Sequence, residues 1–374
     1  MTHSLYIVDV FAEHPYTGNQ LAVVGDADNL SDETMQRIAA EMNFSETTFV
    51  SHIPESNGGY RVRIFTPARE IPFAGHPILG TAWVIRHRVM PNAPTTLHLN
   101  ITIGQVHVTF ETSVDGGVTA WFLAPPVTPG RTCTRESIST SLGLLPEDIE
   151  TKSPIQQFSA GVSAVIVPLR NLDALRRCRL DLDAYAKLKL AGFPPLVYLF
   201  CPETHSPEND LCARFFFEAH GLREDPATGN GAAFLGAYLL EHRCFGDSGF
   251  SLRIEQGYEV QRPSLILLRA QMGDGGRDVR VGGSVIPVAQ GELLDPPVRR
   301  GSTVFSEHRE RKNRTERIRA VCPADSIRAT IRRMHPRSIC DTPVALSVLC
   351  HRPDVRQKNT PPHSISDAYG CHRN

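Results

Sequence analysis

The sequence predicts an α+β protein made of two similar halves. Two segments, 61–87 and 213–242, share one order: an apolar strand, a polar loop, a glycine turn and a helix. This repetition indicates an internal duplication. A two-fold arrangement of the halves would place the two turns across a cleft, where small ligands tend to bind. The first candidates for chemistry are therefore the turn residues, Gly75, His76, Asp225, Gly229 and Asn230.

The amino-terminal region alternates strands with a helix. Residues 5–11 and 21–25 are apolar, as in buried strands, and 14–20 have the composition of a turn. A helix is expected over 32–43 with Ser31 as its N-cap, because acidic residues occupy the first turn. Apolar residues at helical spacing predict that one face of this helix is buried.

Residues 44–50 follow that helix and lead into a strand. Strand alternation places Glu46 on one face with Phe44 and Thr48, opposite Ser45. A carboxyl group among apolar side chains has a raised pKa, which a general base near neutral pH requires. Spacing alone also allows an ordinary exposed or hydrogen-bonded glutamate, and this alternative stays open.

Both glycine turns precede helices, which we expect over 77–88 and 232–242. The first N–H groups of a helix lack partners within it, so each turn is suited to a carboxylate of a small substrate. Neither turn has the spacing of a phosphate loop. Two ordinary interpretations remain: His76 as a capping or packing residue, and Asp225 as a turn residue before Pro226.

Composition places the chain among enzyme-sized proteins without strong global charge. It has 374 residues, 41% of them hydrophobic, and a formal net charge of -1. Nothing here indicates nucleic acid or anionic lipid as a partner. No long apolar run or signal-peptide layout is present, so a cytoplasmic location without membrane association is expected. The 9 cysteines include no pair at zinc-site spacing, and we interpret them as reduced thiols without a metal.

The basic residues concentrate near the carboxyl terminus. Residues 298–374 hold 16 Lys and Arg against 7 Asp and Glu, without sustained periodicity. We interpret this segment as a largely disordered, solvated tail. Contact with nucleic acid is the less favoured alternative, and a frameshifted or read-through gene end is another. The predicted domains are residues 1–128, 129–297 and this tail.

Six motifs now carry a resemblance across residues 5–293. They read VDVFAEHPYTGNQLAVV, EMNFSETTFV, YRVRIFTPAREIPFAGHPILGTA, EDPATGNGAA, IEQGYEVQRPS and VRVGGSVIPVAQGEL. In this order they resemble the PhzF-like phenazine-biosynthesis family of isomerases. The resemblance implies the diaminopimelate-epimerase fold, in which each half wraps a curved sheet around a central helix and the active site lies between the halves. It also implies a homodimer that needs no metal or organic cofactor. The best understood member isomerises trans-2,3-dihydro-3-hydroxyanthranilate.

The resemblance also implies roles for individual residues. Glu46 matches the acid/base carboxylate, and His76 and Asp225 match its catalytic partners. The positions expected to bind the substrate are Ser45, Gly75, Thr228, Gly229, Asn230 and Gly231. Two residues depart from the pattern, because family members usually have serine at Asn230 and glycine at Gln261.

These features predict an isomerase that moves a proton on a small, cyclic, carboxylate-bearing metabolite, in secondary metabolism. One carboxyl group of raised pKa both removes and returns the proton. Related racemases use a cysteine at each turn, and neither turn here has one. The alternative is a non-catalytic binding or regulatory protein on the same fold, with the basic tail docking a partner.

Overall fold

The computed structural model describes residues 2–294, apart from positions 91, 93, 115, 220, 221, 247 and 274. The described residues all lie within one compact unit. The predicted basic tail therefore lies outside the described residues, and its predicted disorder stays a prediction. Among the described helices, none has both the length and the apolar character needed to cross a membrane.

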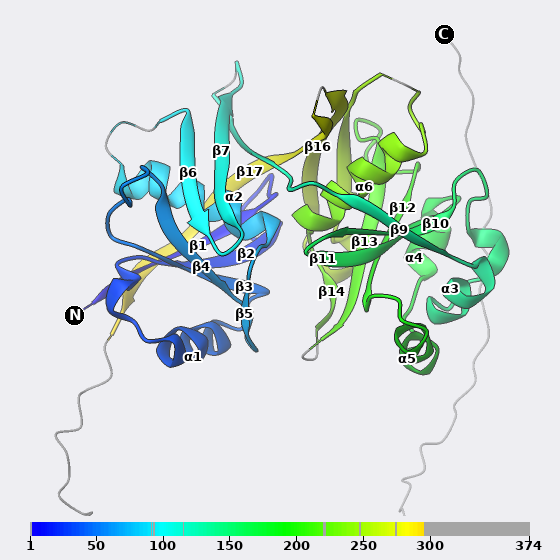
Figure 1. Ribbon diagram of the computed structural model, residues 1–374, viewed down its shortest axis with the longest axis horizontal. Coiled ribbons are helices and arrows are strands. Elements are labelled where there is room, and N and C mark those ends of the chain that lie inside the picture. The colour runs from blue at the N-terminus through cyan, green and yellow to red at the C-terminus, as the bar shows by residue number, and fades with distance from the viewer. Residues whose placement is uncertain are drawn as a thin grey trace, which may run out of the picture. The chain divides into compact units, whose positions relative to one another are not determined.

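A closed ring of strands forms the amino-terminal half (Figure 1). Its strands are β1 (His3–Val10), β2 (Asn19–Val24), β3 (Glu46–Val50), β4 (Tyr60–Phe65), β5 (Glu70–Ile71), β6 (Thr96–Ile101), β7 (Gly104–Thr112) and β8 (Val118–Leu123). Pairing runs from β1 through β2, β3, β4, β6, β7 and β8 to β17 (Gly276–Leu293), which pairs back with β1. The ring encloses α2 (Gly75–Val84), while α1 (Asp32–Met42) packs outside it against β3 and β4.

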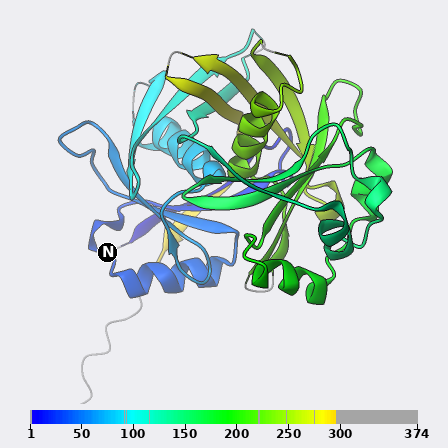
Figure 2. The ribbon, with the colours of Figure 1, turned by 45° about the vertical axis from the view of Figure 1, so that its right-hand side comes forward.

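The carboxyl-terminal half repeats this arrangement. Its strands are β9 (Thr128–Cys133), β10 (Ile155–Ala160), β11 (Val162–Pro168), β12 (Leu196–Cys201), β13 (Leu211–Ala219), β14 (Leu222–Asp225), β15 (Phe250–Gln256) and β16 (Ser264–Gly273). Its helices are α3 (Arg135–Ser141), α4 (Leu172–Arg177), α5 (Leu182–Leu190) and the central α6 (Gly229–Glu241). Short 3-10 turns occupy Ala27–Asn29, Pro146–Asp148 and Tyr258–Val260. Figure 2 shows α2 and α6 between the sheets of the two halves.

The pairing directions establish the duplication. From β1 to β7 the contacts alternate antiparallel and parallel, and the same series recurs from β10 to β16. The short hairpin strands β5 and β14 precede the central helices α2 and α6 in the two halves. The predicted fold of two pseudo-symmetric halves is thus confirmed.

One strand belongs to both halves. The first part of β17 pairs with β16 and β8, and its last part pairs with β1 from Val285 to Leu293. Correspondingly, β9 follows β8 in the chain but pairs with β10. The halves are therefore joined by exchanged strands, and the predicted domain boundaries at 128 and 297 remain predictions.

Both central helices are apolar around nearly their whole circumference, as helices enclosed by sheet must be. A glycine lets each approach the sheet closely. A Cβ at Gly80 would lie 2.6 Å from Leu21 Cδ2, and one at Gly236 would lie 2.8 Å from Val279 Cγ1. The two helices and strands of both halves share one continuous core.

The sequence located these helices but misplaced their ends. The helix expected over 77–88 begins at Gly75, and its last turn, Ile85–Val89, is π-helical. The helix expected over 232–242 is Gly229–Glu241. Glycines usually weaken a helix, so the turns were expected to precede the helical residues. The predicted N-cap of α1 is confirmed, because the Ser31 side chain accepts a hydrogen bond from Thr34 N.

Candidate active site

A cavity of about 220 Å³ lies where the two halves meet, at the amino-terminal ends of α2 and α6. Its polar lining residues are Asn43, Ser45, Glu46, Thr66, Arg69, His76, Asp225, Thr228 and Asn230. Its apolar side chains are those of Pro67, Ile71, Phe73, Ala74, Val162, Leu196, Phe215, Phe217 and Phe234. Gly75 and Gly229 complete the lining, so all but one of the predicted site residues are on the cavity wall.

The remaining one, Gly231, follows Asn230 in the first turn of α6. A Cβ at this position would come within 2.5 Å of the Tyr198 ring. The glycine therefore has a packing role behind the cavity, and Tyr198 is part of that support.

The two central helices touch at their first residues. A Cβ on Gly75 would lie 2.9 Å from Gly229 Cα, and one on Gly229 would lie 3.1 Å from Gly75 Cα. The N-cap residues Ala74 and Thr228 provide no side-chain cap. Two uncapped helix ends thus converge on one cavity, which favours an anionic group there.

Glu46 and His76 face each other in this cavity. Glu46 is the first residue of β3, and His76 lies in the first turn of α2. Glu46 Oε2 lies 3.3 Å from His76 Nε2, within ion-pair distance. The two atoms are not hydrogen-bonded to each other, and neither has another partner among the described residues. Both atoms are therefore available to a bound molecule.

Asp225, at the end of β14, is held by several donors. Its Oδ1 accepts hydrogen bonds from Asn19 Nδ2 at 2.9 Å and from Ser45 Oγ at 3.1 Å. Its Oδ2 accepts one from Thr228 Oγ1 at 2.6 Å. Asn19 Nδ2 also lies 2.8 Å from Ala227 O and 3.3 Å from His76 Nδ1. This network ties the catalytic candidates of both halves together.

Burial shifts the pKa values of Glu46, Asp225 and His76. It raises the pKa of Glu46 well above its usual value, and the nearby Asp225 charge raises it further. Burial also raises the pKa of Asp225 to about 6, although hydrogen bonds from Thr228, Asn19 and Ser45 oppose this. We assign the higher pKa to Glu46, because Asp225 has three donors to stabilise its charge and Glu46 Oε2 has none. Burial lowers the pKa of His76 to about 3, so its imidazole is neutral.

The strand alternation predicted around Glu46 was partly wrong. Ser45 and Glu46 both line the cavity, although alternation placed them on opposite faces. The cause is that β3 begins at Glu46, so Ser45 still belongs to the preceding bend. Phe44 does not line the cavity, and Phe73, Phe215 and Phe234 supply the aromatic surroundings instead.

Sequence reasoning missed two supporting residues. Asn19 was interpreted only as part of a turn, yet it is buried and bonds Asp225 across the two halves. Gln256 is also buried, and its Nε2 donates to Asp225 O at 2.8 Å. The signal for Asn19 was a polar residue at the start of an apolar strand, where a buried amide requires partners.

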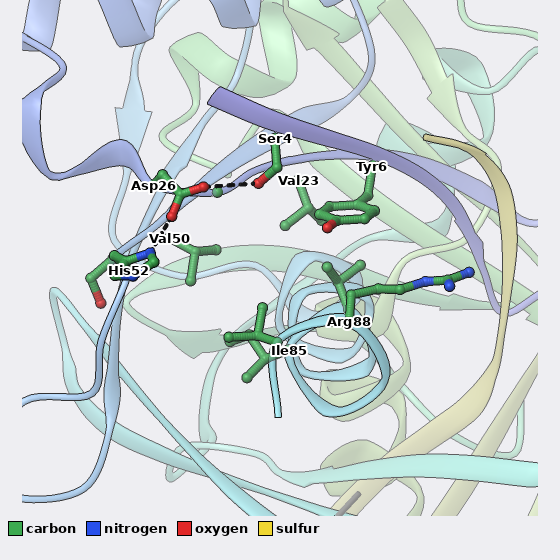
Figure 3. Close-up of a pocket in the computed structure, with 12 residues that line it drawn as sticks. Ser4, Tyr6, Val23, Asp26, Val50, His52, Ile85 and Arg88 are labelled. Atoms are coloured by element: carbon green, nitrogen blue, oxygen red, sulfur yellow. Dashed lines mark hydrogen bonds and ion pairs between the residues drawn. The ribbon is translucent and has the colours of Figure 1, made fainter. Parts of the chain in front are cut away.

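A second cavity of about 300 Å³ lies at the opposite end of α2. Figure 3 shows Asp26 bonded to Ser4 and His52 on one side and the Arg88 side chain on the other. Val23, Val50 and Ile85 lie between them. None of the predicted site residues lines this cavity.

One described cluster has the residue types of a metal site. Ligand atoms of His205, Cys212 and Glu255 lie within 4.8 Å of one another. Glu255, however, accepts hydrogen bonds from the backbone N–H groups of His205 and Ser206 and from the Asn209 amide. These bonds account for the buried carboxylate without a cation.

The fold is diaminopimelate epimerase-like, with buried titratable side chains in a cavity between the two halves. Residues 8–291 match the family described as phenazine biosynthesis-like protein (PhzC-PhzF). The chain belongs to this family, and it is an isomerase of the PhzF type.

Individual relatives agree with this placement. The chain is 36% identical over 305 residues to an uncharacterised isomerase of Mesorhizobium japonicum, covering 78% of this chain and 99% of the relative. It is 36% identical over 292 residues to a trans-2,3-dihydro-3-hydroxyanthranilate isomerase of Pseudomonas aeruginosa, covering 77% and 98%. A solved PhzF-family structure from Bacillus anthracis superimposes with a TM-score of 0.72 at 27% identity, covering 79% of this chain and all of that one.

Proposed function

We propose that this protein moves a proton between two carbons of a small, unsaturated, cyclic carboxylic acid, using Glu46 as the only acid/base group and no cofactor. The observation that carries the proposal is the Glu46 Oε2 atom, which is buried at the cavity without a hydrogen-bond partner among the described residues. The Pseudomonas aeruginosa relative suggests a substrate resembling trans-2,3-dihydro-3-hydroxyanthranilate.

The proposed reaction begins with the ionised Glu46 carboxylate. It removes a proton from a saturated ring carbon, and the electron pair left behind spreads over the adjacent double bond. The new carboxylic acid then returns the proton to the far carbon on the same face, so the double bond shifts and Glu46 is regenerated. Burial of the carboxyl group supports this role, because a pKa nearer neutrality makes it both an adequate base and an adequate acid.

The neighbouring groups would bind and orient the substrate. The converging helix ends favour its carboxylate. His76 Nε2 and Asn230 Oδ1 are buried without hydrogen-bond partners among the described residues, so both are available to its amino or hydroxyl groups. Asp225 would stabilise a positively charged amino group and hold Ser45 and Thr228 in place.

Three broader expectations belong to this proposal. A homodimer and a place in secondary metabolism follow from the family resemblance, a cytoplasmic location was expected from the sequence composition, and all three stay predictions. The non-catalytic alternative also stays testable, because it requires ligand binding without turnover.

The test combines a conservative variant with deuterated water. Glu46→Gln keeps the size and polarity of the side chain but cannot accept a proton. With trans-2,3-dihydro-3-hydroxyanthranilate, we expect turnover to fall by about 10²–10⁴-fold while ligand affinity changes little. Wild-type turnover in deuterated water should place deuterium at the carbon that receives the proton, to the extent that the carboxyl group exchanges first.

The matched control is Glu41→Gln, since Glu41 is an exposed residue of α1. It should retain parental turnover. Turnover of Glu46→Gln within a few-fold of the parent would remove Glu46 from the mechanism. Binding of the acid by both wild type and Glu46→Gln, with no turnover in either, would favour the non-catalytic alternative.

A further inference from the structure

The active-site cavity has an unneutralised positive charge on its wall. Arg69 is the single Lys or Arg among the described lining residues. The other ionisable groups of the lining are the Glu46 and Asp225 carboxyls and the neutral His76. No feature of the acid/base chemistry described above uses a cation at this position.

The backbone of Arg69 is firmly held. Its carbonyl oxygen accepts hydrogen bonds from Thr66 N at 2.8 Å and from Thr66 Oγ1 at 2.9 Å. Its N–H donates to Thr66 Oγ1 at 3.1 Å. Gln36 Nε2 donates to Thr66 O at 3.0 Å, which ties the turn to α1. The exposed Arg69 side chain therefore extends from a fixed turn that lines the cavity.

The adjacent acidic residue, Glu70, is already paired with another arginine. Glu70 forms a two-point contact with Arg63, at 2.8 and 2.6 Å, and Asp32 bonds the same guanidinium at 2.6 Å. These contacts raise the pKa of Arg63. The Arg69 guanidinium makes no hydrogen bond or ion pair with any residue in the described part of the chain, so it is free to bind an anion.

The rest of the cavity suits a ring that carries two acidic groups. Phe73, Phe215, Phe217 and Phe234 offer an apolar surface for the ring. We propose that Arg69 binds a second anionic group of the substrate, while the helix ends at Gly75 and Gly229 bind the first. Arginine matches a carboxylate with two parallel hydrogen bonds, so the residue selects diacids over monoacids. This inference rests on the proposed function only in treating the bound acid as the substrate, because diacid binding can be measured without turnover.

The experiment compares benzoate with isophthalate and terephthalate by titration calorimetry. In the wild type we expect at least one diacid to bind roughly tenfold tighter than benzoate, as a charge-assisted hydrogen bond would give. Arg69→Gln should remove this preference and leave benzoate affinity unchanged. Arg69→Lys should keep part of it, since the charge remains without the two-point geometry.

The control is Arg88→Gln, which removes the same charge at the other cavity, at the opposite end of α2. It should keep the diacid preference. The inference is overturned if neither diacid binds tighter than benzoate in the wild type, or if Arg69→Gln weakens monoacid and diacid equally. Failure of the proposed function would look different. The Arg69-dependent preference for a diacid would persist, but neither the wild type nor Glu46→Gln would isomerise any acid.

Discussion

Gly75 and Gly229 meet backbone to backbone, each leaving no room for a Cβ on the other. The contact joins the first turns of the two central helices, so it sets the separation of their N–H groups. Glu46 and Asp225 lie beside these helix ends, one from each half. The position of Glu46 relative to Asp225 thus depends on a contact between two glycine backbones.

We expect Gly75→Ala to destabilise the fold and impair the site together. Its Cβ would lie 2.9 Å from Gly229 Cα and 3.0 Å from Phe122 Cζ, and the backbone side of this clash cannot rotate away. Overpacking of this kind costs about 1–3 kcal/mol of unfolding free energy. Urea unfolding followed by circular dichroism measures the loss. The control is Gly291→Ala, where an added Cβ meets nothing within 4 Å. Equal stability of the two variants would contradict the contact.

Turnover should rise with pH and then level off. Burial raises the pKa of both Glu46 and Asp225, so both carboxyl groups hold their protons in acid. Ionised Glu46 is the proposed base, and turnover should fall about tenfold per pH unit below the apparent pKa of the pair. His76 adds no transition in the neutral range, since its pKa is about 3. A profile of kcat/KM against pH tests this. Activity that falls as pH rises from 5 to 8 would mean that protonated Glu46 starts the reaction.

The same pKa shifts should lower stability as pH rises. A carboxyl group whose pKa is higher in the folded than in the unfolded chain stabilises the fold below its unfolded pKa, near 4. That contribution is lost as pH rises through the folded pKa, about 6 for Asp225 and well above the usual value for Glu46. Glu46→Gln removes one titration, so its melting temperature should exceed that of the wild type by a margin that grows between pH 4 and pH 8. A constant margin would argue against a raised pKa at Glu46.

Asn19→Ala should shift the pH profile as well as reduce stability. The change removes the amide that donates to Asp225 Oδ1 and Ala227 O. Asp225 Oδ1 keeps the hydrogen bond from Ser45, but the buried Ala227 O loses its donor, which costs about 1–3 kcal/mol. Losing a donor should also raise the pKa of Asp225, so the acid limb of kcat/KM moves to higher pH. Asn57→Ala, which removes an exposed amide, is the control. A loss of stability with an unshifted profile would give Asn19 a structural role only.

The two halves and most residues of the candidate site could be predicted, because short sequence patterns indicate them. The glycine turns, the Ser31 cap and the strand that begins at Glu46 are short-range features; the cap is confirmed, and the turns and Glu46 line the cavity although the helix ends and the strand alternation differ from expectation. The meeting of His76 and Asp225 could be expected only from the assumption that the duplicated turns face each other.

Long-range contacts could not be predicted in the same way. Asn19 bonds a residue more than 200 positions away, and nothing near Asn19 in the sequence reveals that partner. Arg69 has no acidic partner in the described part of the chain, while Glu70 and Asp32 both bond Arg63. These bonds depend on the register of β4 and β5 and on the packing of α1, which the sequence does not specify locally. The exchange of β9 and β17 between halves likewise depends on pairings that no local pattern specifies.

The pairing of β17 with β1 has a consequence for synthesis at the ribosome. His3 emerges long before its partner Leu293, which is among the last residues of the described chain. Until then β1 has an unpaired edge and the first barrel stays open, although all its other strands have been made. Open strand edges promote association between chains. Nascent chains of this protein should therefore depend on chaperones for most of their elongation, and truncation within β17 should yield aggregates rather than a stable amino-terminal half.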